Sequence, residues 1–214
     1  MYYTRVLLSA QAMPLAMGRW ESACSGRLCA DTRRLPRGSD LDWKRELAVA
    51  HLVKQKIAEV DVDRLWESTL PGIAALEDQL QSLEARLGYE LDPQHRTFLL
   101  YANGWRAFMQ RVDVFGVDDF VGGPRAARAA ALINSRHDLE TLCVFGRPDL
   151  LPIAVSSDDI DVMVMTRSHT STPGKVLWLA GGLVDTFPGF DEWFLAMVDY
   201  NRHEYQRLVK KHGR

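Results

Sequence analysis

Three carboxylates within four residues form the one acidic cluster that suggests catalysis. They belong to the stretch Asp158-Asp159-Ile160-Asp161. Carboxylates at such spacing can hold a divalent cation for phosphodiester or glycosyl hydrolysis. A metal-dependent hydrolase that uses Asp159 and Asp161 is therefore one hypothesis. The stretch also lies between two predicted strands, where Asp favours turns by hydrogen-bonding its own backbone. We favour the turn, and expect no catalytic residue, no metal and no cofactor.

Other chemistry-bearing patterns are missing from the sequence. It contains no phosphate-binding glycine loop, no nucleophile elbow, no HExxH and no paired CxxC. The six histidines are scattered, and His51 has no second ligand one helical turn away. Trp105 and Trp193 could stack a sugar or a base. Both flank predicted apolar helix faces, so we expect them in the core.

Composition indicates an ordinary globular protein. The chain has 214 residues, of which 47% are hydrophobic and 25% charged, and its net charge is −2. General nucleic-acid binders carry a basic excess, so no nucleic-acid partner is expected. No apolar run approaches the roughly 18 residues of a membrane span, so no membrane partner is expected either. Cys24, Cys29 and Cys143 form no metal-type pair, which favours a reducing, cytoplasmic location.

Two helices joined by a tight corner are predicted between residues 73 and 104. Leucines and an isoleucine recur at steps of three and four, which predicts one apolar helix stripe: Ile73, Leu76, Leu80, Leu83 and Leu87. Gly88 should end this helix in the left-handed conformation, and Asp92-Pro93 should begin the next. Asn103-Gly104 should close the second helix, because these residue types tolerate positive φ.

The remaining predicted elements are helices and strands, which are distinguished by the spacing of their apolar residues. A helix capped by Ser39 or Asp40 is expected before residue 60, with 60–66 as its extension or a second short helix. A helix is also expected at 125–136, and a long C-terminal helix should bury a stripe of Phe190, Phe194, Met197, Val198, Asn201, Tyr205 and Leu208. Strands are predicted at 106–115, 142–145, 151–155, 160–166, 175–180 and 183–187, with a loop at 116–123 and a hairpin turn at Gly181-Gly182.

This order predicts an α+β fold: N-terminal helices packed on a mainly antiparallel β-sheet and closed by a long C-terminal helix. Three segments are expected. Residues 1–40 read as an irregular extension, although Tyr2 to Ala10 could be a strand. Residues 41–69 form a helical lead-in, because Leu70-Pro71-Gly72 breaks the pattern, and residues 70–214 form the main domain.

The helical corner resembles the opening of the SUKH domain. The resemblance is carried by Leu83-Glu84-Ala85-Arg86-Leu87-Gly88, Leu91-Asp92-Pro93, Phe98-Leu99 and Asn103-Gly104. Asp92 interrupts the family's leucine-proline, and His95 stands where the family tends to carry a tyrosine. The superfamily contains many bacterial immunity proteins against polymorphic toxins, and a eukaryotic branch tied to cell-wall regulation. The resemblance therefore implies a binding module rather than an enzyme.

Acidic side chains are concentrated between residues 113 and 161. This span holds nine acids against four bases, a surplus of five negative charges. Loops usually carry binding residues, and an acidic rim accelerates the capture of a basic partner. A solvated acidic face without a partner is equally compatible with the pattern, and the resemblance favours the binding role. The predicted partner-binding residues are Asp113, Asp118, Asp119, Asp158, Asp159 and Asp161.

Together these features predict an immunity protein that occludes the active site of a basic, cognate toxin directed at nucleic acid. A regulatory or scaffold module of the same superfamily is the alternative, and the hydrolase is a third. The sequence leaves open whether the C-terminal helix forms a homodimer.

Overall fold

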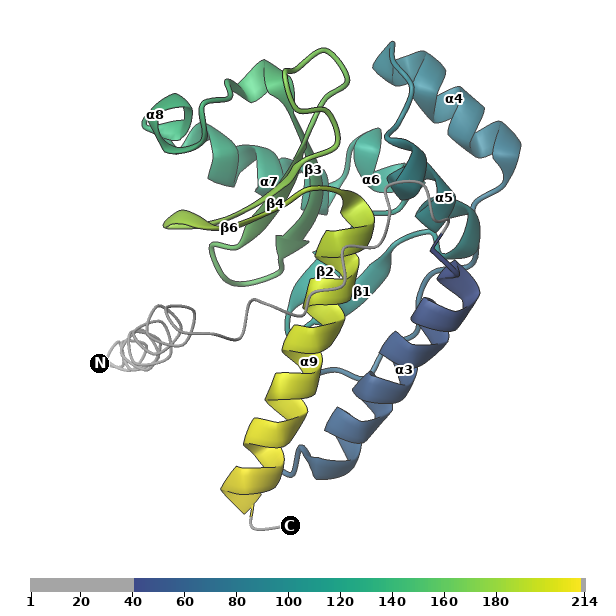
Figure 1. Cartoon of the computed structure of the whole chain (residues 1–214), viewed down its shortest axis with the longest axis vertical. Coiled ribbons are helices and arrows are strands. Elements are labelled where there is room, and N and C mark those ends of the chain that lie inside the picture. Colours follow the sequence, from purple (N-terminus) through teal and green to yellow (C-terminus); the bar gives the residue numbers. More distant parts are fainter. Residues whose placement is uncertain (1–40, 213–214) are drawn as a thin grey trace, which may run out of the picture. The chain divides into compact units, whose positions relative to one another are not determined.

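Six antiparallel strands form one sheet whose spatial order is the order of the chain, β1-β2-β3-β4-β5-β6. The structure is a computed structural model, which describes residues 41–212 (Figure 1). The strands are β1 (Trp105–Met109), β2 (Val112–Val114), β3 (Leu150–Ser156), β4 (Val162–Thr166), β5 (Val176–Ala180) and β6 (Gly182–Phe187). Every neighbouring pair is antiparallel, and short connections join all of them except β2 and β3, between which residues 115–149 form helices.

Helices precede the sheet, interrupt it and follow it. They are α3 (Trp43–Val60), α4 (Glu77–Leu87), α5 (Pro93–Tyr101), α6 (Val117–Phe120), α7 (Pro124–Asn134), α8 (Leu139–Cys143) and α9 (Phe190–His212), with a 3₁₀ turn, η1, at Arg147–Asp149. The expected α+β class, with a closing C-terminal helix, is confirmed.

The sheet has a separate hydrophobic core on each face. Met163 and Met165 of β4 pack with the residues of α3, α5 and α9. Val162 and Val164, which alternate with them, pack with Ala129 of α7 and with α8. In Figure 1, α7 and α8 accordingly lie across the sheet from α9. Both faces are covered, which explains why all five residues of β4 are buried.

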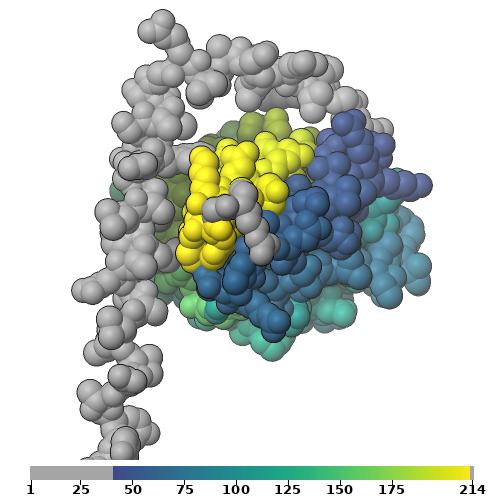
Figure 2. Space-filling view, turned by 90° about the horizontal axis from the view of Figure 1, so that it is seen from below, coloured from purple at the N-terminus to yellow at the C-terminus, as the bar shows by residue number. Residues whose placement is uncertain are grey.

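Helices α3 and α9 lie side by side and run in the same direction (Figures 1 and 2). Near their N-terminal ends, the Trp43 ring contacts Phe194, with centroids 5.2 Å apart, and Phe98 of α5, at 5.4 Å. Near their C-terminal ends, Ile57 and Val60 pack on Leu208. Helix α3 thus belongs to the same core as the elements that follow residue 70.

The aromatic and sulfur side chains assigned to the core are buried there. Trp105 and Trp193 are at most 1% exposed, and Met163, Met165 and Met197 are buried as well. In the C-terminal helix the buried stripe includes Trp193 and Glu204, whereas Tyr205 is half-buried. The pattern predicted the helix correctly, but the buried stripe is broader than the one inferred.

The helix predicted from Ile73 begins only at Glu77. Ile73 is 93% exposed and Leu76 is 63% exposed, so neither belongs to the buried stripe, whereas Leu80 and Leu83 do. The backbone before α4 bonds to other elements instead, because the Gly72 amide donates to the Gly104 carbonyl at 2.8 Å. The joint was predicted correctly: Gly88 has a φ of +76°, and Asp92 caps the Gln94 and His95 amides.

Three further elements differ from the sequence interpretation. The strand predicted over 106–115 is two strands, separated by a tight turn at Gln110, whose φ is +50°. The strand predicted over 142–145 is the end of α8, followed by Val144 with a φ of +69°. The loop predicted over 116–123 contains α6. Only the run at 142–145 was ambiguous in period, because a short apolar run fits a strand as well as a helical turn. In the other two cases the prediction missed a turn within the strand and a single helical turn within the loop.

The first described helix begins at Trp43, capped by Asp42 rather than by Ser39 or Asp40. The helix ends at Val60, so neither the predicted extension nor a second short helix is present at 61–66. The expected extension at 1–40, with its candidate strand and Cys24 and Cys29, lies outside the described residues. Within residues 41–212, no helix is both long enough and apolar enough to cross a bilayer.

One polar side chain lies inside the aromatic core. His95 is 0% exposed, and its ring stacks on Phe190 with centroids 4.6 Å apart. Phe120 contacts it edge-on at 5.5 Å. Neither ring nitrogen has a hydrogen-bond partner among the described residues. Burial lowers the pKa of His95 to about 3, so the folded protein holds a neutral imidazole there.

We predict that His95 makes the fold acid-sensitive. Its pKa is about 3 when folded and 6.5 as a free side chain, so between these values the unfolded chain binds more protons. The unfolding free energy of the protein is therefore not reduced by His95 above pH 6.5. As the pH falls below 6.5, protonation of His95 in the unfolded chain lowers this free energy by about 1.4 kcal/mol per pH unit. In urea denaturation at pH 7.5 and pH 5.0, His95→Phe should shrink the pH-dependent loss by about 2 kcal/mol. The exposed His203→Gln should leave the loss unchanged. An equal loss in H95F and the wild type would contradict the prediction.

Candidate partner-binding surface

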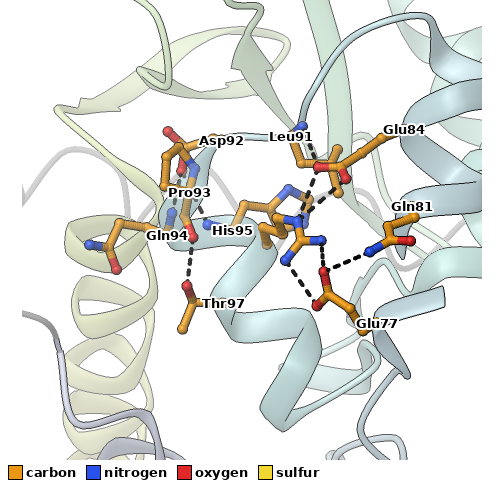
Figure 3. A network of polar contacts seen from close by, with 10 residues as sticks. Glu77, Gln81, Glu84, Leu91, Asp92, Pro93, Gln94, His95 and Thr97 are labelled. Atoms are coloured by element: carbon orange, nitrogen blue, oxygen red, sulfur yellow. Dashed lines mark hydrogen bonds and ion pairs between the residues drawn. The ribbon is translucent and has the colours of Figure 1, made fainter. Parts of the chain in front are cut away.

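The corner between α4 and α5 is held together by Arg96 and two carboxylates of α4, Glu84 and Glu77. Glu84 accepts hydrogen bonds from the Leu91 amide at 3.0 Å and from Arg96 Nε at 3.2 Å. Arg96 also bonds to Glu77 at the start of α4, so the two helices are connected twice (Figure 3). Asp92 caps α5 from the other side of the joint, where burial raises the pKa of its carboxyl. The motif that carries the family resemblance is therefore a structural corner.

Asn103 connects this corner to the acidic part of the chain. Its side-chain oxygen accepts the Val117 amide at 2.7 Å, which fixes the start of α6. A Cβ at either Gly72 or Gly116 would lie within 2.6 Å of the Asn103 carbonyl oxygen, so the backbone on both sides requires glycine. Asn103 thus lies between the segment before α4 and the segment that carries Asp118 and Asp119.

Strand β1 contains a bulge at Ala107, whose φ is +47°. Three buried polar side chains bond to the backbone there. Asp113 accepts the Ala107 amide at 2.7 Å, Lys54 of α3 donates to the Ala107 carbonyl, and Asn201 of α9 donates to the Phe108 carbonyl at 2.8 Å. Burial lowers the pKa of Lys54 to about 8, against the opposing effect of Glu67. Asp113 is 7% exposed, so it stabilises the bulge from the interior.

Arg125 of α7 joins two of the predicted partner-binding acids. It lies 3.2 Å from Asp113 and 2.7 Å from Asp119. Asp119 also accepts the Gly116 amide at 2.9 Å, at the start of α6. Asp118, the neighbouring residue, is exposed. Asp113 and Asp119 are therefore engaged within the fold, whereas Asp118 is free to face solvent.

The loop between β3 and β4 is held by two other arginines. Arg128, one helical turn after Arg125, donates to the Asp159 carbonyl at 2.7 Å and to the Ser156 carbonyl. Arg111, in the β1–β2 turn, forms an ion pair with Asp158, and its carbonyl accepts the Ser157 amide. Asp158 remains exposed and Asp159 partly so. The loop is fixed in place while its carboxylates stay accessible.

Asp161 faces a different neighbour. Its carboxylate accepts the indole N–H of Trp178 at 2.6 Å, and burial raises its pKa. The Asp159 carboxylate instead accepts the Ile160 amide at 2.7 Å, as expected for a turn. Within residues 41–212, no three His, Cys, Asp or Glu side chains are grouped as metal ligands. The two carboxylates of the hydrolase hypothesis are thus engaged separately.

The predicted acids do not form one uniform rim. Asp118, Asp158 and Asp159 are accessible, while Asp113, Asp119 and Asp161 bond to groups inside the domain. Sequence reasoning counted the arginines of this span only as opposing charge. Arg125 and Arg128 stand three residues apart in a predicted helix, so their shared face was a signal that both contact the same layer. Arg111 lay just outside the counted span.

The fold is an α+β domain with a helix corner, an antiparallel meander and a closing C-terminal helix, the arrangement expected of a SUKH domain. The model of the SMI1 / KNR4 family (SUKH-1) matches residues 74–196, more than half of the chain, and the chain belongs to this family. Comparison with curated proteins gave no match. Family membership supports an immunity protein or a related SMI1/KNR4 module, a class that is generally non-enzymatic.

We predict that two acids of this set differ sharply in their effect on stability. Asp113→Ala leaves the Ala107 amide without its acceptor and Arg125 without one of its carboxylates, so it should cost about 3 kcal/mol of unfolding free energy. Asp118→Ala, the matched control on the exposed side of α6, should change that free energy by less than about 0.5 kcal/mol. Urea denaturation measures both. Equal effects would show that Asp113 is not an interior support.

Proposed function

We propose that this protein is an immunity protein that binds a cognate toxin directed at nucleic acid and neutralises it by covering its active site. The proposal rests on family membership together with the accessible acids Asp118, Asp158 and Asp159. A toxin that holds phosphates must present a basic surface. An acidic surface is the complement that such a toxin would meet.

Internal pairing limits how much negative charge the surface offers. The six predicted acids are accompanied by Arg111, Arg125 and Arg128, which leaves a surplus of three negative charges in this set. Such a surplus accelerates the encounter with a basic partner more than it stabilises the complex. Most of the affinity must therefore come from apolar or aromatic contacts elsewhere in the interface.

Occlusion requires no chemistry from this chain. A rigid surface that fills the toxin's substrate groove excludes nucleic acid by steric overlap and by like charge. The fixed geometry of the β3–β4 loop and of α6 suits this role, because surfaces that are ordered before binding lose less conformational entropy in the complex.

Co-expression tests the proposal directly. The genome region around this chain's gene is searched for a large secreted protein with a small C-terminal toxin domain, and that domain is expressed with and without this chain. We expect the domain to stop growth alone and growth to be restored by the intact chain. Absence of such a domain, or no restoration, would overturn immunity in favour of a regulatory module of the same family.

We predict that Asp118 contributes to the rate of association. Asp118→Lys should slow binding of the toxin domain several-fold at low salt, and weaken the dependence of the rate on ionic strength, because rim charges act mainly on encounter. The matched control is Asp185→Lys, on β6 at the opposite edge of the sheet from β1. Stopped-flow or surface-based kinetics between about 0.05 and 0.5 M salt would show it. Identical rates for D118K and D185K would refute a role for this carboxylate.

A further inference from the structure

Residues 67–76, here called the strap, connect the lead-in to α4 and expose three large apolar side chains. Ile73 is 93% exposed, Leu70 68% and Leu76 63%. Single exposed apolar residues are common, but several within one short segment are characteristic of interaction surfaces. Tyr101, 42% exposed, ends α5 beside the same segment, because the Ala75 amide bonds to the Leu99 carbonyl and the Gly72 amide to that of Gly104.

The strap is fixed along its length. It runs antiparallel to the start of β1, with a bridge between Pro71 and Trp105. The Trp105 indole donates to the Thr69 carbonyl at 3.3 Å, and the Thr69 hydroxyl donates to the Arg106 carbonyl. At its beginning, Lys54 donates to the Glu67 carbonyl at 3.1 Å. The apolar side chains therefore project from an ordered backbone, which lowers the entropic cost of binding.

The exposed leucines and isoleucine lie next to the acidic surface. Gly72 and Gly116 both pack against the Asn103 carbonyl, so Ile73 directly follows one side of this contact and α6 directly follows the other. Asp118, in the first turn of α6, is therefore close to the strap. Helices α4 and α6 are also in contact. The strap and the segment that carries Asp118 therefore flank the same contact with Asn103.

Charge around the strap is negative. Glu67 begins the strap, and Glu77, Asp78 and Asp118 lie in the elements next to it. The neighbouring arginines are Arg106, which pairs with Glu67 at 2.7 Å, and Arg96, which contacts Glu77. Two surplus negative charges remain. A second copy docked on this surface would bring like charges together, because a two-fold dimer juxtaposes identical patches. A basic partner has no such repulsion.

We infer that the strap, with Leu70, Ile73, Leu76 and Tyr101, is the apolar centre of the surface that binds a basic protein partner, and that the acids around it form the rim. An apolar core within a polar rim is the usual anatomy of protein interfaces. The inference rests on the proposed function, and specifies where the affinity of that complex comes from. Truncation at such a centre mainly raises the dissociation rate.

The test uses the full chain and the toxin domain from the co-expression experiment, made inactive by substitution of its catalytic residue. Binding of the wild type and of the double variant Ile73→Ser/Leu76→Ser is measured by calorimetry and by dissociation kinetics. We expect the double variant to weaken the Kd at least about tenfold, through faster dissociation. Its fold should be preserved, because both side chains are exposed and serine at position 76 is a favourable N-cap for α4.

Two matched controls remove exposed apolar groups elsewhere. Val144, which follows α8, is 86% exposed. Leu52 of α3 is 58% exposed and lines an apolar groove of about 190 Å³, together with Val49, Val53, Lys56, Arg202 and Tyr205. Val144→Ser and Leu52→Ser should leave the Kd unchanged.

The outcomes separate the two proposals. Tight binding by the wild type and an unchanged Kd in the double variant would overturn the strap as the centre while leaving the proposed function intact. Equal weakening by V144S or L52S would overturn it as well. No binding by the wild type would overturn both.

Discussion

The bulge in β1 is the constraint on which the rest of the domain depends. Its backbone turns through a positive φ at Ala107 and leaves peptide groups that no neighbouring strand can pair. Buried peptide groups must find partners, and here the partners are Lys54, Asp113 and Asn201. These side chains come from α3, β2 and α9. A single irregularity in one strand thereby fixes the placement of both long helices and uses one acid that would otherwise be on the surface.

The sequence predicted correctly those joints at which two local features indicate the same position. Gly88, Asp92-Pro93 and Gly181 each combine a residue type suited to the local backbone conformation with an interruption of the apolar pattern, and each was placed correctly. Short apolar runs were not decided by pattern, because the stretch that ends in Val144 fits a strand as well as a helical turn. The end of the strap, from Ile73 onward, was assigned to the following helix because Ile73 and Leu76 continue its apolar spacing. Only the tertiary bonds to β1 show that its backbone is committed elsewhere.

The sequence could predict the sign of the charge on the candidate surface, but not which of its acids are exposed. Counting acids and bases indicated a surplus of negative charge between residues 113 and 161; in the fold, Asp118, Asp158 and Asp159 of this span are accessible, on α6 and the β3–β4 loop. Which carboxylates reach solvent depends on arginines distant in sequence, such as Arg111 for Asp158 and Arg125 for Asp113. A count of acids and bases along the sequence only subtracts the positive charges from the negative ones. In the fold these arginine–acid pairs divide the acids into interior supports and accessible groups, and they also hold the loops that carry the accessible ones.

The hydrophobic core to which α3 and α9 contribute extends beyond the residues that match the family model. The family match stops at residue 196, inside α9, and starts after α3 has ended. Yet Trp43 and Ile57 on one side, and Val198 and Leu208 on the other, cover apolar surface of the shared core. The boundaries of the family match therefore differ from those of the hydrophobic core. A fragment trimmed to residues 74–196 would lack α3 and most of α9, and would expose the apolar residues that these helices cover.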